Sequence, residues 1–206
     1  MKDPRPLHHD ALTTASGFVD RVEAASWHRA TPCAGWDVAA LVAHMTGQNN
    51  GFARALKHGD ADRQAYAPHA VAVDELPAAW AASVTTLGAA TDQAELDRSV
   101  RLIEVRPEAA LPAAAVVRIH LLDTVVHTWD LATSIALDYR PADDVLDVVE
   151  AVTQQIPTGP TREGATAAFA PPIPSEMPDR WARVLALLGR GQQSAKAVPG
   201  RPDLTR

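Results

Sequence analysis

The chain has one cysteine and no long apolar run, and each of these shortages excludes a class of protein. The lone Cys33 excludes an internal disulfide and a cysteine-rich zinc module. A membrane-spanning helix needs about 18 consecutive apolar residues, and no stretch reaches that length. The N-terminal segment MKDPRPLHHDAL lacks the apolar core of a signal peptide. We therefore expect a cytoplasmic protein with no membrane partner, and we expect Cys33 to be a small, at least half-buried residue ahead of a helix.

The chain also lacks a strong excess of charge of either sign. The formal net charge is only −6, lysine is scarce, and no cluster of Lys and Arg marks a surface for a polyanion. Nucleic acid is therefore not an expected partner. Small molecules are the expected ligands, and the chain is expected to be a monomer or a homodimer.

What is present favours a helical protein. The 206 residues are 47% hydrophobic and rich in alanine, which suits one globular domain with a sizeable core. Apolar residues spaced three or four apart predict helices over about residues 10–26, 38–56, 74–91, 107–137, 142–155 and 179–188. Residues 98–107 are predicted to be extended or to form a loop over one end of the bundle.

This pattern predicts an all-α four-helix bundle, with a long connection at residues 57–73, an extra helix and a short C-terminal helix. Residues 1–156 are assigned to the bundle. Residues 157–206 are expected to form a Pro-rich crossing, the short helix and a frayed tail from about residue 189, packed on the same domain.

Three polar side chains interrupt the apolar segment RIHLLDTVVHTWDLA at residues 118–132. Asp123 and His127 are four residues apart, so they lie on one helix face, and His120, three residues before Asp123, joins them in one polar stripe. Burying such groups without partners costs roughly 1–3 kcal/mol each. These three side chains therefore need hydrogen-bond partners or a bound ion.

The second predicted helix carries a comparable residue, His44 in LVAHMTG, with Gln48 one turn further on. If the two helices pack together, His44, Asp123 and His127 supply two nitrogens and an oxygen, which suit zinc, nickel or ferrous iron. The alternatives are a satisfied core histidine at position 44 and a hydrogen-bonded pair between Asp123 and His127. His120 is a fourth ligand, a proton shuttle beside the metal or a residue at the rim. The remaining histidines are expected to be solvated: His8, His9, His28, His58 and His69.

Two motifs together resemble a known family. TPCAGWDVAALVAHMTG (residues 31–47) and HLLDTVVHTWDLA (residues 120–132) are similar to the mycothiol-dependent maleylpyruvate isomerase N-terminal family, a metal-binding branch of the DinB-like four-helix bundles. The resemblance covers about residues 10–156. The ending RWARVLALLGR also resembles that of single-domain members.

The resemblance implies a divalent metal, commonly zinc, held by His44, Asp123 and His127. Asp123 stands where the isomerase has glutamate, which is one methylene longer, so the two helices must approach more closely or a water must bridge. His120 is expected beside the metal as a catalytic residue, with Gln48 and Trp36 lining the pocket and Asp130 accepting a hydrogen bond from a ligand imidazole.

The family also implies a reaction class. A metal lowers the pKa of a bound thiol, so the expected function is a transferase or isomerase that uses a mycothiol-type thiol on small electrophiles. The isomerase has a large second domain, and only about 50 residues follow the bundle here, so maleylpyruvate isomerase activity itself is not expected. The alternative function is a non-enzymatic metal-binding sensor or interaction protein on the same bundle.

Overall fold

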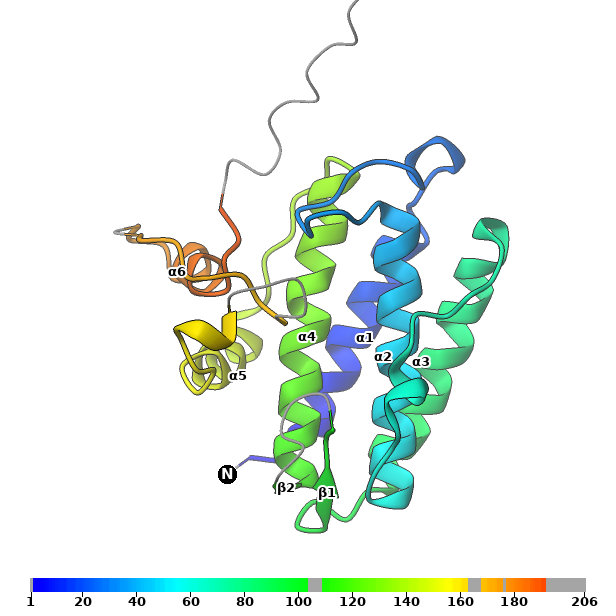
Figure 1. Ribbon diagram of the computed structural model, residues 1–206, viewed down its shortest axis with the longest axis vertical. Helices are drawn as coiled ribbons and strands as arrows, with labels where there is room; N and C mark the ends of the chain where they lie inside the picture. Colours follow the sequence, from blue (N-terminus) through cyan, green and yellow to red (C-terminus); the bar gives the residue numbers. More distant parts are fainter. Residues whose placement is uncertain (1, 104–108, 163–167, 176, 192–206) are drawn as a thin grey trace, which may run out of the picture.

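The computed structural model describes residues 2–103, 109–162, 168–175 and 177–191. Four long helices lie side by side as a bundle, and two shorter helices lie on the outer side of the fourth (Figure 1). The bundle consists of α1 (Arg5–Val19), α2 (Val38–His58), α3 (Leu76–Gln93) and α4 (Ala113–Ser134), and the shorter helices are α5 (Asp143–Thr153) and α6 (Arg180–Leu187). The all-α bundle with an extra helix and a short C-terminal helix is therefore confirmed.

The helix directions follow from which ends share a core. Leu41 at the start of α2 packs in one cluster with Trp80 near the start of α3 and Leu131 near the end of α4. Leu56 at the end of α2 shares another with Leu87 later in α3. Helices α2 and α3 thus run in the same direction, antiparallel to α4, as Figure 1 also shows.

Parallel neighbours require a connection that runs back along the bundle. The segment between α2 and α3 does so, with short 3₁₀ turns at Arg63–Tyr66 and Val73–Glu75. It lies so close to α2 that a Cβ atom added at Gly47 would be 2.2 Å from the carbonyl oxygen of Ala67. Gly51 meets the ring of Tyr66 in the same way. Only glycine permits this approach, which seats the connection on α2.

Polar residues fix the ends of α2 and α6. The side chain of Asp37 accepts a hydrogen bond from the amide of Ala40 at 2.8 Å, and Asp179 caps α6 through Ala182 at 2.7 Å. Gly59, at φ +92°, ends α2 in the left-handed region. These are ordinary helix caps, and they are visible in the sequence.

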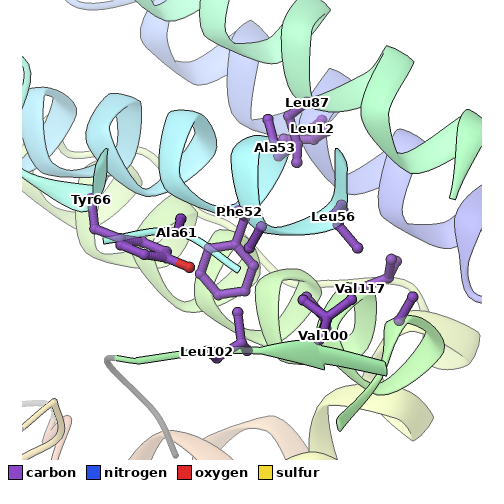
Figure 2. Packing of buried hydrophobic residues seen from close by; sticks show 13 residues of the cluster. Leu12, Phe52, Ala53, Leu56, Ala61, Tyr66, Leu87, Val100, Leu102 and Val117 are labelled. Carbon is purple, nitrogen blue, oxygen red and sulfur yellow. The ribbon is translucent and has the colours of Figure 1, made fainter. Parts of the chain in front are cut away.

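A small hairpin closes the far end of the bundle. Strand β1 (Ser99–Arg101) pairs antiparallel with β2 (Ala110–Pro112), and Val100 opposes Leu111. Val100 and Leu102 cover the end of α2 beside Phe52 and Leu56, as Figure 2 shows. Residues 98–107 were predicted to be extended or to form a loop over one end of the bundle. Ser99–Arg101 form a strand, and residues 104–107 lie outside the described residues.

The first helix differs from its prediction. It begins at Arg5 rather than near residue 10, because Pro6 stands in the first turn, where a missing amide hydrogen costs nothing. It ends at Val19, and only a short 3₁₀ turn, Ala24–Ser26, follows. The earlier start puts His8 inside the bundle with no exposed surface, so the expectation that His8 is solvated was wrong.

The C-terminal segment packs on the outer side of α4. Trp181, Val184 and Leu188 share a core with Leu121 and Val125 of α4. The frayed tail was predicted to begin near residue 189, but Gly189 and Arg190 are part of the packed structure, and residues 192–206 lie outside the described residues. Within the described segments, no helix has the length and apolarity that crossing a membrane requires.

Candidate metal centre

Three potential ligands converge between α2 and α4. His44 projects from α2, and Asp123 and His127 project from one face of α4. One donor atom of each lies within 4.8 Å of the others, and Nε2 of His127 is 3.5 Å from Oδ1 of Asp123. The sequence could place Asp123 and His127 on one face, but only the packing of the helices brings His44 to them.

The two ring nitrogens of His127 face different partners. Nε2 faces Asp123, whereas Nδ1 lies 3.0 Å from Oδ2 of Asp130. Asp130 is fully buried and His127 is 7% exposed, so this hydrogen bond forms away from solvent. A carboxylate at Nδ1 holds the imidazole ring so that Nε2 points at the ligand position. The hydrogen bond predicted between Asp130 and an imidazole of the site is present, and the role of Asp130 beside a metal stays a prediction.

Burial and neighbouring charges separate the two histidines. Burial, with a contribution from His127, lowers the pKa of His44 to about 4, so His44 is neutral at pH 7 and offers a lone pair. Burial also opposes charge on His127, but Asp123 and the hydrogen bond to Asp130 outweigh it and raise the pKa of His127 to about 10. The carboxylates thus make this a place where a positive charge is stabilised.

A tight turn before α2 sets one wall of the site. The amide of Trp36 donates to the carbonyl of Cys33 at 3.0 Å, and Gly35 between them has φ +81°. A turn with positive φ at this position favours glycine there, because glycine has no Cβ atom. The turn brings the Trp36 ring to 4.6 Å from the ring of His44, between centroids.

The same turn delivers a side chain that the sequence did not assign to the site. Cys33 is half-buried as expected, but its Sγ lies 3.2 Å from Oδ2 of Asp130 and 3.9 Å from Nδ1 of His127. Cys33, His127 and Asp130 therefore form a second group with metal-ligand spacing. The guanidinium of Arg190 already lies 3.1 Å from Asp130 and 3.6 Å from the Cys33 sulfur. The positive charge of Arg190 disfavours a metal ion at this second group, so the group of His44, Asp123 and His127 is the better candidate.

The donor set of His44, Asp123 and His127 fits a divalent metal. Ligand atoms around a tetrahedral zinc lie roughly 3.3 Å apart, given metal–ligand bonds of about 2.0–2.1 Å. The 3.5 Å between His127 and Asp123 is close to that spacing. Asp123 and His44 are half-buried and so remain reachable from solvent. Three protein ligands leave a coordination position for water or substrate, as in catalytic zinc sites.

His120 lies in a different environment from these three residues. Its Nδ1 is 3.0 Å from Nε2 of His8 and 3.2 Å from the hydroxyl of Thr124, and its ring centroid is 4.6 Å from that of Phe52. It is 1% exposed, and its Nδ1 contacts α1 through His8. His120 is in neither group with metal-ligand spacing among the described residues, and its predicted catalytic role stays a prediction. Gln48 is buried on α2, one turn from His44.

The fold and the site together define a helical bundle with a candidate divalent-metal centre between its second and fourth helices. A sequence model of the mycothiol maleylpyruvate isomerase N-terminal domain matches residues 8–132, well over half of the chain, and the chain belongs to this family. Among curated proteins, no sequence is similar enough to be matched.

One solved structure shows the same fold. It is a crystal structure of a histidine-to-alanine mutant of the mycothiol-dependent maleylpyruvate isomerase, with a TM-score of 0.59 and 14% sequence identity. The match covers 73% of this chain and 66% of that one, slightly less than two thirds of its length. At this identity the likeness concerns the fold.

Proposed function

We propose that this protein binds a divalent metal ion, zinc by preference and nickel or iron as alternatives, through His44, Asp123 and His127. We further propose that it uses a mycothiol-type thiol as co-substrate in a transfer or isomerisation reaction on small electrophiles. The observation that carries the proposal is the convergence of three metal donors within 4.8 Å. Membership of the family supports the choice of thiol.

A bound metal ion would lower the pKa of a thiol at the open position, so that the thiolate is available near neutral pH. The protein side chains have separate tasks. His44 presents a neutral nitrogen, His127 would present one once the metal ion displaces its Nε2 proton, and Asp123 balances part of the metal charge. Asp130 holds the Nδ1 hydrogen of His127, and the Trp36 ring shields His44 on one side.

The thiolate sulfur would form a bond to an electrophilic carbon, and the thiol proton would pass to solvent. In a transfer, the electrophile then loses its leaving group. In an isomerisation, the sulfur–carbon bond breaks again, the sulfur takes up a proton from solvent and the thiol is released unchanged. Both reactions need the same open position, so the site supports them equally.

The test is thiol consumption by untagged, zinc-loaded protein. Mycothiol would be supplied with a panel of electrophiles, including chlorinated aromatics, and free thiol would be measured over time. We expect zinc-dependent loss of thiol with at least one electrophile, and no loss with His127→Ala. Metal bound at full occupancy with no thiol consumed across the panel would contradict the enzymatic proposal and favour a metal-binding sensor or interaction protein.

A further inference from the structure

Asp130 is the most completely enclosed charge near the centre. Its side chain has no exposed surface, and three donors surround Oδ2: His127 Nδ1 at 3.0 Å, Arg190 Nη2 at 3.1 Å and Cys33 Sγ at 3.2 Å. Burial raises the pKa of this carboxyl, but His127 and Arg190 more than offset it, so the net shift is downward. A buried carboxylate of this kind needs such partners to stay charged.

Arg190 grips this carboxylate with two nitrogens. Its Nε lies 3.4 Å from Oδ1 and its Nη2 lies 3.1 Å from Oδ2 of Asp130. A planar guanidinium that meets both carboxylate oxygens restrains the rotation of the carboxylate, which a single point charge does not. The side chain of Arg190 is only 8% exposed, and its guanidinium stacks 5.5 Å from the ring centroid of Phe169.

The backbone conformation at the end of α6 places Arg190 beside Asp130. At the end of α6 the amide of Arg190 donates to Leu185 at 2.8 Å and that of Gly189 donates to Ala186 at 3.0 Å, the paired bonds of a Schellman motif. Gly189 has φ +74°, and a Cβ there would lie 2.6 Å from Ala170. The buried guanidinium of Arg162 fastens the same end of α6 by donating to the carbonyl of Leu187.

We propose that Arg190 is a positioning residue for the metal centre: it fixes the carboxylate of Asp130, and through Asp130 the ring of His127, so that the C-terminal segment sets the geometry of the centre. The inference rests on the proposed metal site. It assigns a function to a residue 60 positions after Asp130 and outside the matched family domain.

The chain of contacts gives the reason. His127 has one ring nitrogen at Asp130 and the other at the ligand position, so the ring can turn only if the Asp130 carboxylate turns with it. Without Arg190, Oδ1 loses its contact with the guanidinium and Oδ2 retains the imidazole and the thiol. The carboxylate is then free to rotate, and the direction of Nε2 is no longer fixed.

A purely structural role for Arg190, docking the C-terminal segment, makes a different prediction. Arg180 performs that docking on α6, where it pairs with Asp147 at 2.6 Å and Glu150 at 2.7 Å, both on α5. Arg180 has the same charge and comes from the same segment, but it does not contact Asp130. Arg180→Gln is therefore the matched control for Arg190→Gln.

The test uses cobalt(II) in place of zinc, because its visible absorption reports ligand geometry. The full-length wild type, Arg190→Gln, Arg190→Lys and Arg180→Gln would be titrated with cobalt. We expect Arg190→Gln to weaken binding about 10- to 100-fold, the usual effect of removing a group that orients a ligand, and to change the absorption bands. Arg190→Lys keeps the charge and the fold, and its bands should also differ from those of the wild type. Arg180→Gln should match the wild type within about twofold.

Equal weakening in Arg190→Gln and Arg180→Gln, or wild-type bands in both Arg190 variants, would overturn the inference while leaving the metal site intact. If the wild type binds no cobalt, the proposed metal site fails. A metal-free measurement then tests whether Arg190 positions Asp130 and His127. The Nδ1 proton of His127, held by Asp130, should give a slowly exchanging downfield NMR signal in the wild type and in Arg180→Gln. It should exchange faster in both Arg190 variants, and unchanged exchange would refute the positioning role.

Discussion

Nε2 of His8 on α1 lies 3.0 Å from Nδ1 of His120 on α4, and both imidazoles are buried. Only one of these two nitrogens can carry the shared hydrogen when both rings are neutral. The other nitrogens, Nδ1 of His8 and Nε2 of His120, have no hydrogen-bond partner among the described residues. The pair therefore binds α1 to α4, but it leaves one unsatisfied polar atom on each ring.

This pair makes stability depend on pH. Burial, together with His9, lowers the pKa of His8 to about 4, whereas the unfolded value is 6.5. The unfolded chain therefore takes up a proton between about pH 6.5 and pH 4 that the folded chain does not, so stability is lost as the pH falls through this window. For His8 alone we expect the free energy of unfolding to be about 2 kcal/mol lower at pH 5 than at pH 7.

Burial also lowers the pKa of His120, with the same sign for stability. Urea denaturation of the wild type and His8→Gln at both pH values measures the effect. Glutamine can still hydrogen-bond to His120 but does not titrate, so the variant should lose less stability between pH 7 and pH 5. His58→Gln, at an exposed position at the end of α2, should retain the wild-type difference. An equal difference in wild type and His8→Gln would rule out His8 as the cause.

His127→Ala should abolish metal binding, because it removes the ligand that links Asp123 to the buried Asp130. Elemental analysis of untagged protein after zinc loading and gel filtration measures the metal content. His58→Ala, an exposed histidine at the end of α2, is the control and should bind as the wild type does. Equal zinc content in wild type and His127→Ala would refute the site.

His120→Ala should keep the metal but destabilise the fold. The substitution leaves Nε2 of His8 without its partner and opens space beside Phe52, so we expect a loss of about 1–3 kcal/mol in the free energy of unfolding. Zinc content and urea denaturation would be measured on the same samples. A zinc content as low as that of His127→Ala would instead make His120 a ligand.

Gly47→Ala should destabilise the protein by about 1–3 kcal/mol, because its Cβ collides with the carbonyl of Ala67 in the connection seated on α2. Gly17→Ala provides the opposite case. No atom lies within 4 Å of a Cβ at Gly17, so alanine there should stabilise α1 by about 0.5–1 kcal/mol. Thermal unfolding followed by circular dichroism distinguishes the two, and destabilisation of similar size in both would contradict the packing argument.

The sequence by itself determined what depends on neighbours along the chain. Helix periodicity located the bundle. The caps at Asp37 and Asp179 are equally local, because a cap side chain binds an amide two or three residues away. The spacing of Asp123 and His127 put both on one face of α4, since four residues are about one turn. The first helix was misplaced at both ends, and its start was missed because Pro4 and Pro6 stand at its N-cap and in its first turn.

Only the tertiary structure decided where each polar side chain of α4 is directed. His120 turns to His8 on α1, whereas Asp123 and His127 turn to His44 on α2. Cys33 and Arg190 reach Asp130 across 97 and 60 residues of sequence. No local pattern encodes such contacts, because they exist only when packed helices and the C-terminal segment enclose the same buried charge.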